Sequence, residues 1–216
     1  MSGDASRYVL PPGPADRSRF FIPEHLTALY YTPGYAALSL DKRRRYNHYA
    51  ALYLNEMFVF FEDVLAETVL GALLEAKGPG PFASNGLKER LERFRWEERR
   101  HTEMFHALNK AAAPELYRGG EFRFIRASGA ARALLDAAAR RPRLFPMFFW
   151  IMLLQEDRSL YYSREVLKDK DALEPRFVHV HRVHMADEAG HVKADDELLG
   201  LFWAPVPAVW RRLHAA

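Results

Sequence analysis

Glu98-Arg-Arg-His101 and Glu188-Ala-Gly-His191 share one pattern, a glutamate followed three residues later by a histidine. Three residues of α-helix turn through about 300°, so the two side chains of each pair point to roughly the same side. Four-helix bundles use two such pairs, together with one glutamate from each of the other two helices, to hold two metal ions. The repeated pattern therefore predicts a helical bundle with a two-metal centre.

The composition limits what the chain can be. Its 216 residues, 49% of them hydrophobic, suffice for one domain with a substantial core. The absence of cysteine excludes disulfides, iron–sulfur clusters and thiolate zinc sites, which leaves His, Asp and Glu as metal ligands. No run approaches the ~20 apolar residues of a membrane span, and the first residues lack the apolar stretch of a signal peptide. We therefore expect a cytoplasmic protein with no membrane partner.

The net charge of +3 comes from basic residues that are mostly scattered among acidic ones. The one concentrated basic run, Lys42-Arg-Arg-Arg45, is expected to be a solvated helix face. Nothing supplies the interleaved basic and aromatic surface of an RNA-binding protein, so we expect no nucleic-acid partner.

The chain divides into an irregular N-terminal arm, 1–35, that is rich in proline and glycine, and an all-α domain, 36–216. Apolar spacing and helix-breaking residues predict helices at about 41–77, 86–113, 128–140, 147–170 and 176–199, and Lys77-Gly-Pro-Gly-Pro81 is expected to close the first. The tail is expected to form an end helix that packs Trp203 and Trp210 onto the bundle. The fold class is thus an all-α, ferritin-like four-helix bundle with extra helices.

The first helix should supply one inward-facing glutamate, and three are available. Glu62 follows the apolar run 57–61, which covers every face of a helix, so its carboxylate is expected to be buried and to need a partner. Glu56 and Glu67 are the alternatives, but they lie about 120° and 140° from Glu62 and cannot share a site with it. We favour Glu62 because it lies deepest in the apolar stretch.

The third long helix offers Glu156 after the apolar run 148–155, with Asp157 as the alternative. Glu62, Glu98, Glu156 and Glu188 are then separated by 36, 58 and 32 residues. These separations suit a hairpin, a longer crossover and a second hairpin. This order is that of a ferritin-like bundle with one long connection.

The second motif contains a further histidine, His184, four residues before Glu188 and seven before His191. Seven residues return to within about 20° of the same face, so the three side chains form one stripe and His184 is expected to be a metal ligand. His179 and His181 point elsewhere and are expected at the surface or rim. Asp187 is expected to accept the other N–H of the opposite helix's histidine, a role that Glu97 offers in the first motif.

The series Glu62, Glu98-x-x-His101, Glu156 and His184-x-x-x-Glu188-x-x-His191 resembles the AurF-like non-haem di-iron N-oxygenases, which convert arylamines to hydroxylamine or nitro products. The spacings match over about residues 55–195, and the extra histidine separates this family from other ferritin-like proteins. The resemblance implies two iron ions, with manganese as the alternative, O₂ as co-substrate and a small-molecule substrate, with an amine as the first expectation.

The chain has neither a flavin motif nor iron–sulfur ligands, so electrons are expected from a separate donor or reductase. Arg158 is a candidate to meet a substrate carboxylate, although a surface ion pair is the more ordinary role. A homodimer is one of the assemblies that the sequence allows. Rival interpretations are a tRNA or lipid hydroxylase, an iron-storage or peroxide-consuming protein, and a structural helical module. The candidate pocket residues are Phe61, Met104, Phe105, Trp150, Leu154, Tyr161 and Met185.

Overall fold

The computed structural model describes residues 5–75, 86–126, 128–141 and 144–214. Within these ranges the secondary structure is helical, apart from a single bridge that pairs Phe20 with Leu173. The elements are η1 (Ala5–Tyr8), η2 (Glu24–Leu26), α1 (Pro33–Ala36), α2 (Leu40–Phe60), η3 (Phe61–Ala66), α3 (Glu67–Leu74), α4 (Leu87–Ala112), α5 (Gly129–Ala139), α6 (Met147–Lys168), α7 (Pro175–Phe202) and α8 (Ala208–His214).

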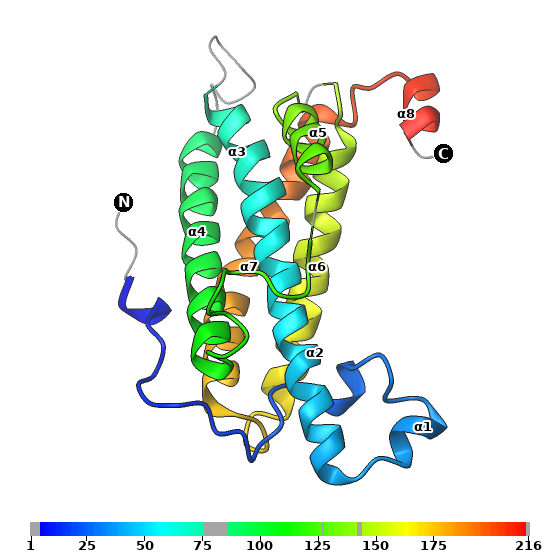
Figure 1. The fold of residues 1–216 in the computed structure, drawn as a ribbon. Helices are drawn as coiled ribbons and strands as arrows, with labels where there is room; N and C mark the ends of the chain where they lie inside the picture. Colours follow the sequence, from blue (N-terminus) through cyan, green and yellow to red (C-terminus); the bar gives the residue numbers. More distant parts are fainter. Residues whose placement is uncertain (1–4, 76–85, 127, 142–143, 215–216) are drawn as a thin grey trace.

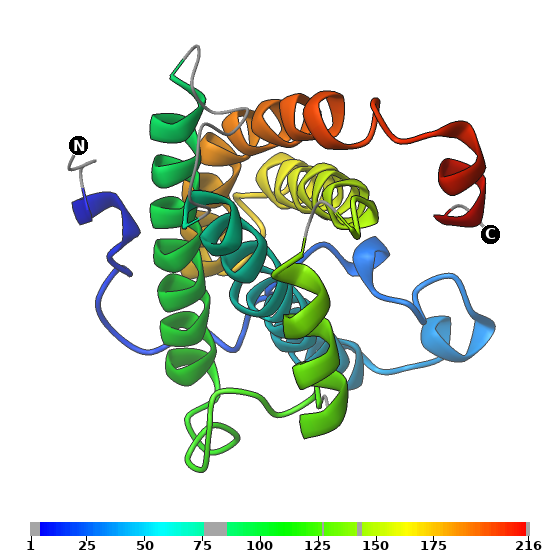
Figure 2. The same ribbon diagram turned by 90° about the horizontal axis from the view of Figure 1, so that it is seen from above.

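Four long rods form the bundle, and Figure 1 shows how they lie. The first rod is α2, η3 and α3 in continuous succession, and α4, α6 and α7 are the other three. Seen from above, the rods surround a common centre, and the connection between α4 and α6 carries α5 along the outside (Figure 2). The all-α, ferritin-like prediction is confirmed, with one long crossover between the two helical pairs.

Local sequence explains where several helices begin. α7 begins at Pro175, and the carboxylate of Glu174 accepts hydrogen bonds from the backbone N–H groups of Arg176 and Phe177. α5 begins after Ser128, whose hydroxyl accepts from the N–H of Ala131. The predicted helix ends agree with these bounds to within a few residues. The expected stop at 77–81 lies outside the described residues.

The first rod changes its hydrogen-bonding pattern at η3, which is a π-helix. A π-helix bonds each carbonyl to the N–H five residues on, so its turn is wider than that of an α-helix, and such turns are frequent at functional sites. Glu62 lies in this segment and is 3% exposed. Of the apolar run before it, Phe58 and Val59 are buried, whereas residues 57, 60 and 61 are only partly buried, so the run is less enclosed than its sequence predicted.

The core consists of two apolar clusters with a belt of polar side chains between them. One cluster surrounds Phe58 and Phe105, toward the beginning of α2. The other surrounds Phe94 and Phe149, toward the end of α3. The glutamates and histidines of the two motifs belong to neither cluster, because they lie in the belt between them.

The arm is fixed to the bundle by both polar and aromatic contacts. The side-chain oxygen of Asn47 accepts from the N–H groups of Phe21 and Ile22, at 2.9 and 3.3 Å. The ring of Phe21 stacks on that of Phe177, with centroids 4.2 Å apart. The arm therefore lies over one end of the bundle, as Figure 1 shows.

The tail only partly follows the prediction. The ring of Trp203 meets that of Trp150 edge-on, with centroids 6.1 Å apart. Trp210, by contrast, is 57% exposed, and α8 projects away from the rods (Figure 1). The expected packing of Trp210 is therefore wrong, because the segment before α8 leads the chain outward. No helix among the described residues combines the length and apolarity that crossing a membrane requires.

Candidate metal centre

The structure brings the seven sequence-predicted ligand residues together in the polar belt. They come from all four rods, and none is more than 3% exposed. They are Glu62, Glu98, His101, Glu156, His184, Glu188 and His191. Carboxylates at this depth are unusual unless they are paired or bind a cation.

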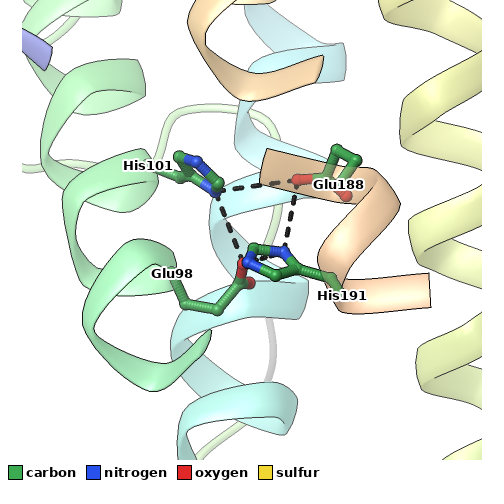
Figure 3. Close-up of side chains that lie close together, drawn as sticks. All are labelled: Glu98, His101, Glu188 and His191. Atoms are coloured by element: carbon green, nitrogen blue, oxygen red, sulfur yellow. Dashed lines mark ion pairs between the residues drawn. The ribbon is translucent and has the colours of Figure 1, made fainter. Parts of the chain in front are cut away.

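A first group of four side chains joins the two Glu-x-x-His motifs across the α4–α7 interface (Figure 3). Each residue offers one nitrogen or oxygen atom, and these atoms all lie within 4.8 Å of one another. Oε1 of Glu98 lies 3.0 Å from Nδ1 of His191 and 3.4 Å from Nδ1 of His101. Oε1 of Glu188 faces the same two nitrogens, at 3.5 and 3.7 Å. The arrangement is compact enough for one cation.

A second group, Glu62, His101 and His184, adjoins the first and satisfies the same distance limit. Nε2 of His184 lies 3.3 Å from Oε1 of Glu62 and 3.0 Å from Oε1 of Glu188. The rings of His101 and His184 meet edge-on, with centroids 4.5 Å apart. His184 thus lies beside the first group, on the face that the seven-residue spacing indicated.

The two alternatives to Glu62 are occupied elsewhere. The carboxylate of Glu56 accepts hydrogen bonds from the hydroxyl of Tyr117 and from the backbone N–H groups of residues 123–125. Glu67 pairs with the guanidinium groups of Arg95 and Arg99. Both glutamates therefore hold other parts of the chain in place, and neither belongs to the belt groups.

Glu156 lies at the α6 side of the centre. Its Oε2 atom is 4.0 Å from Nδ1 of His191, and its Oε1 atom is buried without a hydrogen-bond partner. Burial, together with the charges of Glu188 and Glu98, raises the pKa of Glu156 well above its ordinary value. Asp157, the alternative, is exposed. Of the two, only Glu156 faces the centre.

Several ligand atoms in the belt lack a hydrogen-bond partner within the described part of the protein, although some of them face an oppositely charged group. They are both carboxylate oxygens of Glu98, one oxygen each of Glu156 and Glu188, and the Nδ1 atoms of His101, His184 and His191. Buried polar atoms normally have a hydrogen-bond partner, since leaving one unpaired costs free energy. Cations bound among these atoms would satisfy the carboxylate oxygens and the Nδ1 atoms of His101 and His191, whereas His184 faces the carboxylates with Nε2. Carboxylate oxygen and imidazole nitrogen form a donor set that suits iron or manganese, so the residues fit a two-metal centre.

Two further carboxylates contact the outer sides of the histidine rings, and they do so crosswise. Asp187 of α7 lies 3.1 Å from Nε2 of His101 on α4, and Glu97 of α4 lies 3.2 Å from Nε2 of His191 on α7. An N–H donated to such a carboxylate leaves the other nitrogen, Nδ1, free to bind a metal. Both Nδ1 atoms face the first group.

Without metal, the carboxylates of the belt favour protonated histidine rings. Burial opposes the charge on His184, but the carboxylates of Glu188 and Glu62 outweigh it and raise the pKa of the ring to about 10. The pKa of His191 is also raised well above its ordinary value against the effect of burial, chiefly by Glu98. Metal binding must displace these protons, since a ring nitrogen cannot hold both.

A family model for P-aminobenzoate N-oxygenase AurF matches residues 11–216. The chain belongs to the AurF family. The match covers all four rods and every residue of the two metal-binding groups. Searches of curated proteins and of solved structures found no match.

The AurF-family centre includes polar residues that the sequence reasoning missed. The hydroxyl of Ser159 donates to Glu188 at 2.9 Å, and that of Thr102 donates to Glu62 at 3.1 Å. Asp195 is fully buried, neither of its oxygens has a hydrogen-bond partner, and burial raises its pKa well above the ordinary value. Its position, four residues after His191, continues the stripe of His184 and Glu188, so the same angular argument would have found it.

His181 is not at the surface or rim, so that expectation is wrong. The ring is fully buried, and Nδ1 lies 3.1 Å from the hydroxyl of Ser163 on α6. Burial, reinforced by the neighbouring His184, lowers its pKa to about 3. The reason is that both α4 and α6 pack against α7. A side chain of α7 that points away from the metal groups therefore does not necessarily point toward solvent.

The expected pocket residues divide into two sets. Phe105 is fully buried and lies 5.1 Å, centroid to centroid, from the ring of His184. Met104 is 2% exposed, while Phe61 and Met185 are partly buried. The structure does not bring the other four, which lie along α6, to the centre: Trp150, Leu154 and Tyr161 are 40–62% exposed, and Arg158 is exposed and stacks on Tyr162. They lie about 120–160° around the helix from Glu156, so they face outward.

Proposed function

We propose that this AurF-family protein is a di-iron oxygenase that uses O₂ to oxidise the nitrogen atom of a small amine. The observation that carries the proposal is the convergence of unpartnered carboxylate oxygens and imidazole nitrogens in two adjoining groups that share His101. Membership of a family described as P-aminobenzoate N-oxygenase supplies the reaction class.

The chain's own residues define what such a centre can do. Glu98, Glu188 and His191 would hold one ion, Glu62 and His184 the other, and His101 lies within reach of both. Iron bound there supplies the redox chemistry of O₂ reduction. The crosswise carboxylates hold the histidine rings in place before metal binds. The rest of the protein's task is to orient the substrate and to exclude water.

The apolar surroundings of the belt support an oxidation that must be kept from water. Phe58 and Phe105 approach His184 from one side, and Phe94 stacks on His191 from the other, with centroids 4.0 Å apart. A dry site of this kind limits side reactions of a bound oxidant. We place the aromatic ring of an arylamine on the Phe105 side, because the second metal group and His184 lie there.

The electrons for the reaction are proposed to come from a separate donor. The chain has no cysteine for an iron–sulfur cluster. Manganese fits the same donor set, and the loading experiment below therefore includes it.

The decisive experiment measures metal first and chemistry second. The purified protein is loaded with Fe²⁺ without oxygen, freed of unbound metal and analysed for iron per chain, with Mn²⁺ in parallel. We expect about two iron ions per chain. The His101→Ala variant should lose most of this iron, because His101 belongs to both groups. His106→Ala is the matched control, since His106 lies in the same helix and pairs with Glu121 outside the centre.

Loaded protein is then given 4-aminobenzoate, a reductant and ¹⁸O₂. We expect a hydroxylamine or nitro product that carries ¹⁸O on nitrogen. Iron content that is unchanged in His101→Ala would contradict the metal centre. Iron that binds normally while a panel of arylamines gives no labelled product would contradict N-oxygenation and leave a ferritin-like iron or peroxide oxidase.

A further inference from the structure

The N-terminal arm reaches the metal centre through two residues of η1, Arg7 and Tyr8. Nη2 of Arg7 lies 2.5 Å from Oδ1 of Asp187, and the hydroxyl of Tyr8 donates to Oδ2 of the same carboxylate at 2.8 Å. The same Arg7 nitrogen lies 3.6 Å from Oε1 of Glu97. One guanidinium group therefore contacts both carboxylates that face the outer nitrogens of the metal-centre histidines.

These contacts form a connected set. Asp187 meets Nε2 of His101 and Glu97 meets Nε2 of His191, so each ring is linked to Arg7 through a single carboxylate. A carboxylate with no other partner can rotate away from the imidazole that it holds. Asp187 is fixed at both oxygens, at Oδ1 by Arg7 and at Oδ2 by Tyr8, so its orientation toward the ring is determined by the arm.

Glu97 has a second partner of its own. Arg93, one turn earlier on α4, donates to Oε1 of Glu97 at 2.8 Å. Asp187, by comparison, has only partners from the arm besides His101 among the hydrogen bonds that the described residues make. The dependence on the arm is therefore expected to be greater for His101, the histidine common to both metal groups.

The arm is packed against this part of the bundle and does not merely touch it. Tyr8 is 7% exposed, its ring meets that of Trp96 edge-on at 5.7 Å, and it lies 5.9 Å from the ring of His101. A cavity of about 230 Å³ opens between α4 and α7, with Glu97, Asp187 and His191 in its wall. Without Arg7, water in this cavity would compete for both carboxylates.

Arg7 and Tyr8 precede the part of the chain that matches the family model, which begins at residue 11. Membership of the family therefore does not account for them. The main attachment of the arm, at Phe21 and Asn47, lies further along the chain, so changing η1 leaves that attachment intact.

We propose that Arg7 and Tyr8 are positioning residues of the metal centre, which fix Asp187 and Glu97 and thereby orient His101 and His191 for metal binding. The inference rests on the proposed metal-binding function. A positioning role for Arg7 and Tyr8 makes a different prediction from a purely structural attachment of the arm. A structural attachment stabilises the fold whether or not metal is present, whereas a positioning contact changes how tightly the centre holds metal.

The test compares three variants of the full chain: Tyr8→Phe, which keeps the ring and removes the hydroxyl; Arg7→Gln combined with Tyr8→Phe; and Arg7→Lys, which keeps the charge. Arg17→Gln is the matched control, because Arg17 also fastens the arm, through the carbonyl of Ala112 at the end of α4 and the carboxylate of Glu115 just after it, away from the centre. Each protein is loaded with Fe²⁺ without oxygen, and the rate of iron release to a chelator is followed.

Loss of a carboxylate that orients a ligand typically weakens metal binding 10–100-fold, so we expect the double variant to release iron about tenfold faster or more. Tyr8→Phe should show a smaller increase in the rate of iron release. Arg7→Lys should release iron more slowly than the double variant, and Arg17→Gln should release it at the wild-type rate. The Co²⁺-loaded proteins should show the same order in the shift of their visible absorption bands, which report ligand geometry.

Unfolding midpoints of the metal-free proteins give the second readout, and we expect similar midpoints for the double variant and Arg17→Gln. Release of iron at the wild-type rate by the double variant would overturn the inference and leave the proposed function standing. The inference would also be overturned, with the proposed function still standing, if the variants released iron faster only to the extent that the unfolding midpoints of their metal-free forms were lower. Failure of the wild type itself to bind iron would overturn both.

Discussion

Nε2 of His101 on α4 lies 3.1 Å from Oδ2 of Asp187, which α7 supplies directly before Glu188. The reverse contact, from His191 of α7 to Glu97 of α4, joins the same two helices. In both motifs the residue next to the inward-facing glutamate thus holds the histidine of the other motif. Neither helix can shift along the other without moving a candidate metal ligand. The packing of α4 against α7 and the geometry of the metal centre therefore depend on the same contacts.

Replacing Asp187 with asparagine should weaken metal binding more than replacing Glu97 with glutamine. The asparagine side chain keeps the size of the aspartate but lacks the charge that pairs with Arg7 and orients His101. We expect a 10–100-fold loss of iron affinity for Asp187→Asn, since contacts of this kind have effects of that size. Competition with a chelator measures it. An affinity equal to that of the wild type would show that the carboxylate is not needed to orient the ring.

Glu62 and Glu56 should separate metal binding from stability. Glu62→Gln is expected to lower the iron content, because the side chain belongs to the second metal group. Glu56→Gln should leave iron per folded chain unchanged and lower the free energy of unfolding by about 2 kcal/mol, because a buried carboxylate that accepts several hydrogen bonds loses its charge. Metal analysis and urea unfolding distinguish the two variants. A lower iron content in Glu56→Gln, with an unchanged content in Glu62→Gln, would indicate that Glu56 is the ligand instead.

The stability of the metal-free protein should fall as the pH rises above neutrality. The folded-state pKa of His184 is raised to about 10, above the ~6.5 of an unfolded chain. Its contribution is therefore complete below about pH 6.5 and is lost as the pH rises toward 10. His184→Gln should show a shallower decline between pH 7 and 10 in urea unfolding. An equal slope in the two proteins would contradict the raised pKa.

Loading with metal should reverse that trend. Metal ligands must lose their protons, so iron binding strengthens as the pH rises and weakens in acid. The stability gained on loading with Fe²⁺ should therefore increase from pH 6 to pH 8. Measuring the unfolding midpoint with and without metal at each pH checks it, and a gain that does not vary with pH would be inconsistent with protonated histidines in the metal-free centre.

His181 should give the opposite dependence, at lower pH. Its folded-state pKa is lowered to about 3, so the unfolded chain binds a proton first as the pH falls below about 6.5. Stability then declines toward acid by up to about 1.4 kcal/mol per pH unit from this residue. The double variant His181→Leu, Ser163→Ala removes the ring and its partner together. Its unfolding free energy should decline less steeply between pH 6 and 4 than that of the wild type.

The outward face of α6 should tolerate change. Leu154 is 62% exposed, and Arg158 is exposed as well. Leu154→Ala and Arg158→Ala should each change the free energy of unfolding by no more than about 0.5 kcal/mol and leave KM for an arylamine unaltered. Steady-state kinetics test this, and a raised KM in either variant would restore that face as a substrate site.

The helices and the two Glu-x-x-His pairs were predictable because they depend on spacing within one helix, whereas Glu62 and Glu156 were predicted from the apolar runs before them. A spacing of three or seven residues fixes the relative direction of side chains, and this placed Glu98 with His101 and His184 with His191. The pairing of Asp187 with the opposite histidine was expected because metal-bound histidines usually donate their other N–H to a carboxylate, and Asp187 directly precedes the inward-facing Glu188.

The remaining features depend on packing between elements far apart in the sequence. His181 is covered because α6 lies against it, and Trp210 is exposed because the tail leaves the bundle. The spacing of residues within one helix predicts neither fact. Arg7 is 180 residues from Asp187, in a segment without helical periodicity. The outward position of Leu154, however, was available from the helical angles, since it lies about 160° from Glu156.

The position of Arg7 and Tyr8 has a practical side. A purification tag joined just ahead of them would sit within a few residues of the guanidinium group, and a charged or histidine-rich tag would bring its own ligands to the edge of the iron-binding belt. The opposite end of the chain follows α8, which projects away from the rods (Figure 1). Recombinant protein intended for iron analysis should therefore carry its tag at the C-terminus.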